Sequence, residues 1–559
     1  MDRSWSWQGD LASVRGSPSE IRAAALPRLT GIHATLTTGG VRGTDLGGVV
    51  RFYGIPYAED PVGDLRFAAP VSRRPWSGVR DATRPAATAQ RLRFDPDPAI
   101  PEPIVAGTDI LHVDVWAPAE GRGHPVMVWI HGGGWESGSS HQPWFDGSSF
   151  ARRGIVVVSV GYRLGVEGFT PFPDAPDNRG LLDWIAALEW VRDEIRAFGG
   201  DPGRVTVSGQ SAGGGAVLCL LGSPPAAGLF HGAIAASPAI LRAPATPAPK
   251  GVTAEKLAAG GRGAVDEFHR RLRRDNQFTL PFRPVVGGET LPVPPLESVA
   301  GGAATALPLL IGSTAAEFEA IADTLPGPAL VPGAAMMALS QQLPREGLRA
   351  LARQSTGRSL RRSVGSVIDA AAIHSTVARA AETRVSAGDP TWVYDFRWAD
   401  GRGPRHCADL PFFWSAPHAE NVERYLGAPA PTHLVEAMHA SWADFVAGGD
   451  PGHPAYEAPG RLVRSWAATP SVVVDGLAEQ PVFCIRNYLE DGGMAAARHE
   501  ANKGRLKLPV RYIVCGDMPL YVVYCNQRDT QSVSGRLGVG HAHEQCARKP
   551  RSVGCRHGI

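Results

Sequence analysis

Residues 205–215, Val-Thr-Val-Ser-Gly-Gln-Ser-Ala-Gly-Gly-Gly, decide the fold. A β-branched run ends at Ser208, the pattern Gly-x-Ser-x-Gly occupies 209–213, and an apolar run of helical character follows. In this setting the pattern is typical of a tight strand-to-helix turn with a serine at its apex. Small neighbours are needed because larger side chains would collide with the adjoining strand and helix. The sequence therefore predicts that Ser211 is a nucleophile, beside the positive end of a helix; a plain Gly/Ser turn is the alternative.

A second glycine-rich motif follows an earlier strand. Residues 126–130 (Val-Met-Val-Trp-Ile) are apolar throughout, and His131-Gly132-Gly133-Gly134-Trp135 comes directly after them. Three successive glycines leave the backbone N–H groups unshielded, so that they are able to converge on one point, as an oxyanion hole requires. A flexible loop is the alternative, but the position between a buried strand and an aromatic residue favours a shaped backbone.

The segments between these motifs indicate an α/β protein. Residues 126–130 and 155–160 are the short, nearly all-apolar runs expected of strands buried on both faces of a parallel sheet. Residues 181–198 carry apolar side chains at helical spacing, and 205–208 form the next strand. Strand, helix and strand in this order make a βαβ unit. We therefore expect a mostly parallel, doubly wound sheet with helices on both faces.

The rest of the chain is less strongly patterned. Residues 239–265 are rich in Ala, Pro and Gly, and we expect a loop or a degraded helix-loop region there. Three later segments have helical character: residues 346–360, 364–385 and 432–446.

The chain divides into three parts by composition. Residues 1–29 form an N-terminal extension, 30–486 a single catalytic domain, and 487–559 a tail. Four of the seven cysteines lie in the tail, at Cys515, Cys525, Cys546 and Cys555. Their spacing, together with the nearby histidines, matches no common zinc pattern. We therefore expect no metal site. The tail is either an appended module or a translated reading frame not shaped by folding, and in the second case we expect it to be disordered.

Bulk properties exclude several functional classes. The formal net charge of +2 gives no reason to expect a nucleic-acid or anionic-membrane partner. Charged residues interrupt the N-terminal stretch, and no apolar run is long enough to span a bilayer. Only Cys219 and Cys407 lie in the first 480 residues, which is no disulfide framework. We expect a cytoplasmic protein that is a monomer.

Four stretches carry a family resemblance. They are Gly-Ile-Pro-Tyr-Ala-Glu-Asp-Pro-Val-Gly-Asp-Leu-Arg-Phe at 54–67, the glycine motif at 131–135, residues 178–202, and Gly-Gln-Ser-Ala-Gly-Gly from 209. In this order they resemble the type-B carboxylesterase/lipase family, which includes bacterial para-nitrobenzyl esterases and the cholinesterases. The resemblance extends from about residue 30 to about 480. It implies the α/β-hydrolase fold and a carboxylic ester hydrolase activity.

The resemblance also selects partners for Ser211. With seventeen histidines, the residues alone leave the base open. The family's acid lies in a Gly-(Thr/Ser)-x-x-x-Glu motif, which implies Glu317, and its histidine shortly precedes an Asp/Glu-Leu-Pro-Phe/Tyr run, which implies His406. The rival acid Glu319 and the rival bases His418 and His439 lack these motifs.

The implied chemistry is two-step acyl transfer on small, fairly apolar esters, without metal or organic cofactor. The family's oxyanion donors correspond to the N–H groups of Gly133, Gly134 and Ala212. Several aromatic residues flank the motifs and are candidates either for lining a substrate pocket or for packing in the core. They are Trp135, Phe412 and Phe413, with Phe145 and Trp414 beside them.

The chain departs from the family in several places. Gln210 replaces the usual Glu before the nucleophile, and Ile110 replaces a cysteine, so the disulfide of secreted relatives is absent. The region 239–275 looks shortened, and from this we expect a more open site. A non-catalytic scaffold is a competing hypothesis, but such relatives typically lack the serine that Ser211 provides. A transacylase or an amidase would form the same acyl-enzyme intermediate, so the sequence leaves these two activities open as alternatives.

Overall fold

The computed structural model describes residues 33–477, apart from 90–91, 94–96, 241–244, 277–280, 301–303, 305, 320–330, 332–333, 336–337, 339–358 and 475. The predicted N-terminal extension, the predicted tail and residues 346–358 of one predicted helix lie outside the described residues. Among the helices that the structure describes, none is both long and apolar enough to cross a bilayer.

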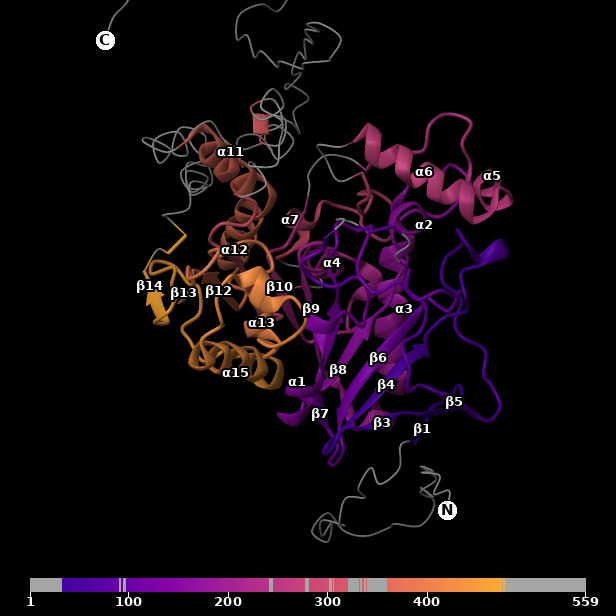
Figure 1. The fold of residues 1–559 in the computed structure, drawn as a ribbon, viewed down its shortest axis with the longest axis horizontal. Coiled ribbons are helices and arrows are strands. Elements are labelled where there is room, and N and C mark those ends of the chain that lie inside the picture. Colours follow the sequence, from indigo (N-terminus) through magenta and orange to yellow (C-terminus); the bar gives the residue numbers. More distant parts are fainter. Residues whose placement is uncertain are drawn as a thin grey trace, which may run out of the picture. The chain divides into compact units, whose positions relative to one another are not determined.

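An eleven-stranded sheet forms the centre of the domain (Figure 1). Its strands in chain order are β3 (Thr44–Asp45), β4 (Val49–Pro56), β6 (His112–Pro118), β7 (His124–Ile130), β8 (Val156–Val160), β9 (Gly200–Gln210), β10 (Gly232–Ala236), β11 (Leu309–Thr314), β12 (Thr391–Phe396), β13 (Val463–Trp466) and β14 (Ser471–Val473). Their spatial order is β14-β13-β12-β11-β10-β9-β7-β8-β6-β4-β3. The pairs from β8 through β13 are parallel, and the pairs at the two ends are antiparallel. A separate small sheet contains β1 (His33–Thr35), β2 (Gly40–Arg42) and β5 (Val79–Asp81).

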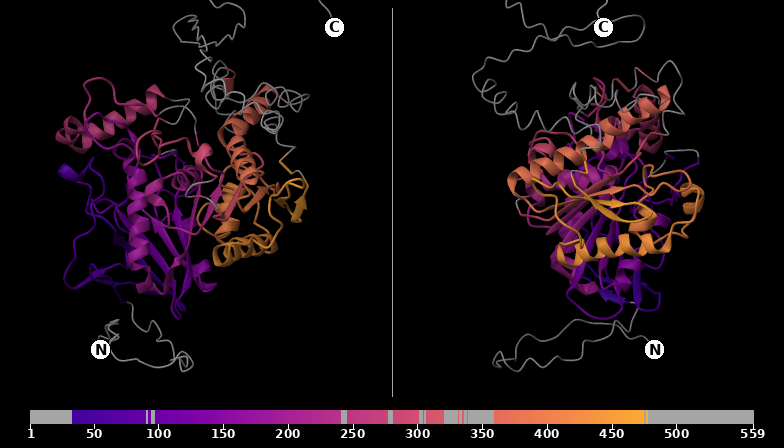
Figure 2. Two further views of the ribbon diagram at one scale, coloured as in Figure 1. Left: turned by 180° about the vertical axis from the view of Figure 1, so that it is seen from behind. Right: turned by 90° about the vertical axis from the view of Figure 1, so that its left-hand side faces the viewer.

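Helices cover both faces of the sheet, as Figure 2 shows from two further sides. They are α1 (Ser148–Arg152), α2 (Gly165–Phe169), α3 (Arg179–Glu194), α4 (Ala212–Leu221), α5 (Ala254–Ala259), α6 (Gly261–Asp275), α7 (Pro295–Ser298), α11 (Leu360–Asp369), α12 (Ser375–Ala387), α13 (Leu410–Phe413), α14 (Val422–Leu426) and α15 (Thr432–Gly448). Short 3₁₀ turns lie at η1 (Gly63–Leu65), η2 (Pro143–Phe145), η3 (Ile195–Phe198) and η4 (Pro224–Ala226), and a π turn, η6 (Ala370–His374), joins α11 to α12. The predicted fold class is therefore confirmed.

Alternation along the strands explains the two layers. Met127 and Trp129 of β7 belong to a core cluster with residues of α1, α13 and α15, on one face of the sheet. Val126, Val128 and Ile130 alternate with them and are also fully buried. Strands buried on both faces must be apolar throughout, which is why these runs could be identified from the sequence. The parallel pairing of β7 with β9 brings the carboxyl ends of the two motif-bearing strands together.

Of the two interpretations of residues 239–265, a loop or a degraded helix-loop region, the second agrees with the structure, because helices α5 and α6 begin within this segment. Helix α5 begins after Thr253, whose hydroxyl accepts a hydrogen bond from the N–H of Lys256. Helix α6 buries Val265, Phe268 and Leu272 along one face. The glycines at its start suggested a loop, but they mark the break between two helices.

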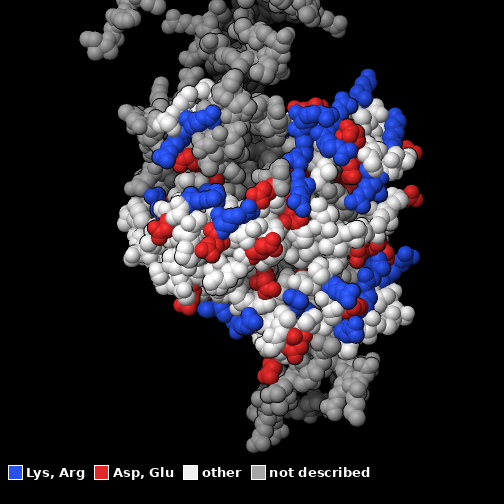
Figure 3. Space-filling view, in the orientation of Figure 1, with Lys and Arg blue, Asp and Glu red and all other residues white. Residues whose placement is uncertain are grey.

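Figure 3 shows basic and acidic side chains interspersed on one face of the domain, in keeping with the balanced formal charge.

Candidate active site

Ser211 stands at the sharp junction between β9 and α4. Its φ of 58° and ψ of −122° form a backbone conformation that few residues other than glycine adopt. Its N–H donates to the carbonyl oxygen of Ala236 at 3.0 Å. Its own carbonyl oxygen accepts from the N–H groups of Gly215 at 2.9 Å and Ala239 at 3.0 Å. The end of β10 and the segment after it therefore hold this strained turn in place.

The glycines beside Ser211 are required because backbones approach closely. A methyl group at Gly209 would lie 2.4 Å from the carbonyl oxygen of Gly213. One at Gly213 would lie 2.0 Å from the carbonyl oxygen of Ile130. Both distances are far inside van der Waals contact, and the opposing atoms belong to the central sheet or to α4.

Gly213→Ala is therefore expected to destabilise the fold. We expect the free energy of unfolding to fall by about 1–3 kcal/mol or more, because overpacking against backbone cannot be relieved by a side-chain rotation. Denaturant unfolding followed by circular dichroism measures the change. The control is Gly448→Ala in α15, where the added methyl group meets nothing within 4 Å. Equal stability of the two variants would contradict the close packing at Gly213.

The glycine loop after β7 lies directly against the serine. A methyl group at Gly132 would be 3.1 Å from the Cβ of Ser211. Gly133 and Gly134 have φ values of 115° and 62°. The carbonyl oxygen of Gly133 accepts from the N–H of Glu136 at 3.1 Å and from the N–H and hydroxyl of Ser137, each at 2.9 Å. Among the described residues, the N–H groups of Gly133 and Gly134 donate to no acceptor.

His406 connects Ser211 to a buried carboxylate. Its Nε2 lies 2.9 Å from the Oγ of Ser211, and its Nδ1 lies 2.5 Å from Oε2 of Glu317. Its own N–H donates to the carbonyl oxygen of Glu317 at 2.8 Å, and the hydroxyl of Tyr425 donates to its carbonyl oxygen. The ring of Phe318 lies over the imidazole, with centroids 4.4 Å apart. The imidazole is thus fixed from several sides.

Glu317 follows β11 and is only 2% exposed. Its Oε1 accepts from the hydroxyl of Ser237 at 2.7 Å and from the N–H of Thr314 at 2.8 Å, while Oε2 faces His406. Each carboxylate oxygen therefore has its own donors. This division fixes the plane of the carboxylate relative to the imidazole.

The electrostatics favour a charged pair. Burial tends to raise the pKa of Glu317, but the charge and hydrogen bond of His406 outweigh it, and this pKa lies below its ordinary value. Burial tends to lower the pKa of His406. The neighbouring Cys407 and Glu317 outweigh that effect, and the pKa of His406 lies well above its ordinary value. The site therefore stabilises a proton on His406.

Known protein families with similar sequences show the family to which this chain belongs. Residues 31–471 match the model of the carboxylesterase family. The chain belongs to the carboxylesterase family. It is a carboxylic ester hydrolase, and its substrates are esters.

Individual relatives agree with this assignment. The chain is 34% identical to the para-nitrobenzyl esterase of Bacillus subtilis (strain 168), over 76% of this chain and 92% of that protein. It is 32% identical to the phenmedipham hydrolase of Pseudarthrobacter oxydans, over 75% and 90% of the two chains. A solved structure of a thermophilic para-nitrobenzyl esterase superposes with a TM-score of 0.70 at 30% identity, over 81% of this chain and all of that one.

The rival residues of this carboxylesterase lie elsewhere. His439 is buried on α15, where its Nδ1 donates to the carbonyl oxygen of Phe413 and its ring packs on Phe150. His418 is exposed, and the backbone of Glu319 lies against Gly365 of α11. The Oγ of Ser211 is hydrogen-bonded instead to His406.

The aromatic pocket candidates pack in the core of the carboxylesterase. Trp135 is 2% exposed and contacts Phe169 and Trp184. Phe412 contacts Phe396 and Trp398, and Phe413 contacts Trp129, Phe150 and Trp442. Phe145 and Trp414 also contact Trp129. These contacts are those of side chains packed in the core, and they give no support for a role of these residues in binding substrate.

Three residues around the site were not singled out from the sequence. Ser237 and Thr314 hold Glu317, and Tyr425 holds the backbone of His406. Ser237 directly follows a strand and has a positive φ, but one serine among many carries no signal in the sequence. Gln210, noted as a departure from the family, lies with its Nε2 3.3 Å from the Nε2 of His406 and 3.3 Å from the sulfur of Cys407.

Proposed function

We propose that the chain hydrolyses small, fairly apolar carboxylic esters through an acyl-enzyme, with Ser211 as nucleophile, His406 as general base and acid, and Glu317 as the orienting acid. One observation carries the proposal. The Oγ of Ser211, the imidazole of His406 and the carboxylate of Glu317 form a continuous line, with separations of 2.9 and 2.5 Å. This is the arrangement that a Ser-His-acid site requires.

The geometry supports a two-step reaction. His406 removes the proton from the Oγ of Ser211 as that oxygen attacks the ester carbonyl, and then donates it to the leaving alcohol. Water, deprotonated by the same imidazole, next attacks the acyl-enzyme and releases the acid. Glu317 keeps the Nδ1 proton in place and stabilises the imidazolium. Its negative charge is maintained by the donors Ser237 and Thr314.

The oxyanion formed in each step needs donors that are free before the reaction. The N–H groups of Gly133 and Gly134 meet this requirement. Ala212 is the first residue of α4, so its N–H has no partner within the helix. We assign these three groups to the oxyanion hole, where the loss of one donor typically costs on the order of 3 kcal/mol of barrier.

Labelling by a fluorophosphonate probe tests the proposal directly. Such probes react only with an activated serine, so a non-catalytic scaffold would stay unlabelled. We expect the full chain to be labelled at Ser211, as shown by mass spectrometry of the modified peptide, and to hydrolyse short-chain p-nitrophenyl esters. A folded protein that neither takes the label nor turns over these esters would exclude the proposal.

A more open site is the second part of the proposal. It rests on the shortened region 239–275, of which α5 and α6 occupy a part. His269 of α6 lies 3.0 Å from the carboxylate of Glu136, just beyond the glycine loop, so this helix borders the site region. Activity on p-nitrophenyl esters of increasing acyl length and branching tests the idea. Strict rejection of bulky esters would count against an open pocket.

The pH dependence provides a further test. His406 must be neutral to accept the proton from Ser211, and its pKa is raised well above 6.5. We therefore expect kcat/KM to fall with decreasing pH through a limb that lies above pH 6.5, because the proton on His406 is then lost only at higher pH. A pH-stat assay with a short-chain ester measures this profile. A limb at or below pH 6.5 would contradict the raised pKa.

A further inference from the structure

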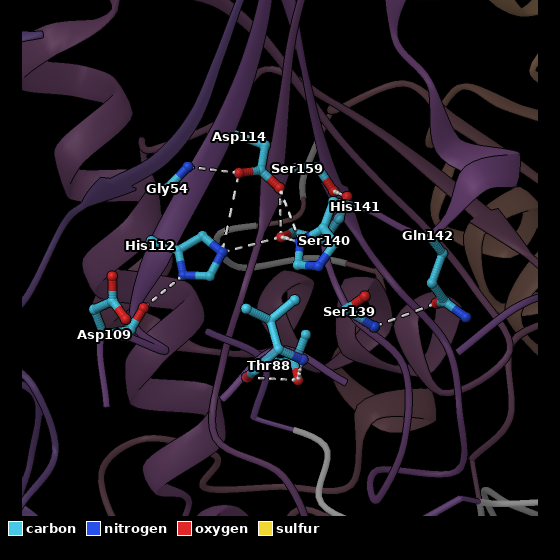
Figure 4. A network of polar contacts seen from close by, with 11 residues as sticks. Gly54, Thr88, Asp109, His112, Asp114, Ser139, Ser140, His141, Gln142 and Ser159 are labelled. Carbon is cyan, nitrogen blue, oxygen red and sulfur yellow. Dashed lines mark hydrogen bonds and ion pairs between the residues drawn. The ribbon is translucent and has the colours of Figure 1, made fainter. Parts of the chain in front are cut away.

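Three buried ionisable side chains meet in a second cluster that the proposed reaction does not use. His112 and Asp114 lie on β6, and His141 lies in the segment after the glycine loop. One nitrogen or oxygen atom of each is within 4.8 Å of those of the other two. Figure 4 shows the carboxylate of Asp114 directed between the two imidazoles, with Ser140 beside them. The side chains are 2%, 0% and 3% exposed.

The distances in this cluster suit a tetrahedral ion. The Nε2 of His112 is 4.0 Å, and the Nδ1 of His141 is 3.6 Å, from the carboxylate oxygens of Asp114. The Oγ of Ser140 lies 2.6, 3.2 and 3.4 Å from Asp114, His112 and His141. Ligands of a tetrahedral ion with bonds of about 2.0–2.1 Å stand roughly 3.3–3.4 Å apart. The five distances scatter around this value; the one from His112 runs to Oδ1 of Asp114, and those from His141 and Ser140 run to Oδ2. Since the ligand atoms of the three side chains all lie within 4.8 Å of one another, a contraction of the cluster would bring them onto one ion.

The surrounding contacts orient these atoms as they do around bound metals. The Nδ1 of His112 donates to the carbonyl oxygen of Asp109 at 2.8 Å, which leaves Nε2 with a lone pair directed at the cluster. The N–H of Gly54 donates to Oδ1 of Asp114 at 2.8 Å, and the hydroxyl of Ser159 donates to the carbonyl oxygen of Ser140 at 2.7 Å. Metal-bound histidines and carboxylates generally have such outer partners.

The charge and the space of the cluster agree with a cation. The carboxylate of Asp114 is fully buried, and in the described part of the chain the ionisable side chains that face it are His112 and His141 rather than a lysine or an arginine. An ionised carboxylate in the interior needs a positive partner. A cavity of about 10 Å³, lined by residues that include His112 and His141, lies beside them, which is about the room needed for one water molecule.

We propose that His112, Asp114 and His141 bind one divalent transition-metal ion, of the zinc class, with Ser140 or a water molecule in the fourth position. Two imidazoles and a carboxylate are ligands that such ions prefer. The ion is structural: it joins β6 to the segment that continues from Gly133 and Gly134, and so stabilises the far end of the glycine loop.

Metal titration of the full chain tests the proposal. Protein from which metal has been removed with a chelator is titrated with Co²⁺, because four-coordinate Co²⁺ complexes absorb strongly in the visible range. In a second experiment Zn²⁺ is added and thermal unfolding is measured. We expect one tight equivalent, a four-coordinate spectrum and a Zn²⁺-dependent rise in Tm. In His112→Gln we expect the affinity for Co²⁺ and Zn²⁺ to fall at least about tenfold, because removing even an outer partner of a metal ligand causes a loss of this size. The Zn²⁺-dependent rise in Tm should disappear in the same variant.

Matched variants separate this site from the cysteines of the tail, which every protein in the series retains. His439→Gln is the control, because His439 is also a buried histidine with its Nδ1 on a backbone carbonyl and its Nε2 unpaired among the described residues. It should bind metal as the wild type does. Asp114→Asn keeps the side-chain shape and replaces His112→Gln if that variant does not fold. Equal binding by all of these proteins, or a wild type without a four-coordinate spectrum, would overturn the proposal and leave a hydrogen-bonded network of histidines.

Discussion

Ser211→Ala is expected to lower kcat for short-chain p-nitrophenyl esters by on the order of 10⁵–10⁶-fold, the scale on which loss of the nucleophile acts in serine hydrolases. The alanine removes the attacking oxygen but leaves the turn, the glycine loop and His406 in place. Residual rate above that of water would come from the oxyanion donors and from substrate binding. Steady-state kinetics, with fluorophosphonate labelling of the same protein, measures the loss.

The control for this variant is Ser208→Ala. Ser208 lies on the same strand, and its buried hydroxyl has no hydrogen-bond partner among the described residues. Its removal should change neither the activity nor Tm substantially. If Ser211→Ala, folded to the wild-type Tm, retained activity within about tenfold of the wild type, Ser211 would not be the nucleophile.

Glu317→Gln is expected to produce the second largest loss, about 10⁴-fold in kcat. Oε1 of Glu317 accepts two hydrogen bonds, from Ser237 and Thr314. The glutamine oxygen would keep these donors, which turns the amide NH₂ toward the Nδ1 of His406. Nδ1 must then accept a hydrogen bond, so the imidazole proton moves to Nε2 and the ring is no longer able to accept the proton of Ser211.

The rival acid provides a matched comparison for this loss. Glu319→Gln makes the same chemical change two residues along the chain and is expected to keep kcat near the wild-type value. Measuring the two variants with one ester and one buffer separates an orienting carboxylate from general loss of negative charge. A larger loss in Glu319→Gln than in Glu317→Gln would reverse the assignment of the acid.

Local sequence determined much of the fold. The strands β7, β8 and β9 are apolar runs because they are buried on both faces, and the glycines at 209 and 213 are required by backbone contacts within a few residues or across one strand pair. Helix α3 begins at Arg179 and ends at Glu194, close to the predicted helix over 181–198, which the turn η3 completes. Such features depend on short-range sterics and periodicity, which a single sequence displays.

Long-range assembly could not be read in the same way. His406 and Ser211 are separated by 195 positions, and Glu317 and His406 by 89, so the choice among the histidines came from the family resemblance. The cluster around Asp114 was missed for the same reason, since β6 meets the segment at 140–141 only in the folded sheet. The bounds of helices α5 and α6 were not predicted, because the glycines at their junction resemble loop composition.

The carbonyl oxygen of Gly133 accepts three hydrogen bonds from Glu136 and Ser137. A peptide group is planar and trans, so its carbonyl and its N–H point in opposite directions. Anchoring the carbonyl of Gly133 therefore aims the N–H of Gly134 away from the turn at 136–137, before any ester arrives. In this respect the loop resembles a fixed solvent dipole. When negative charge develops on the ester oxygen, the N–H of Gly134 already points in its fixed direction, whereas a water molecule in the same position would first have to reorient.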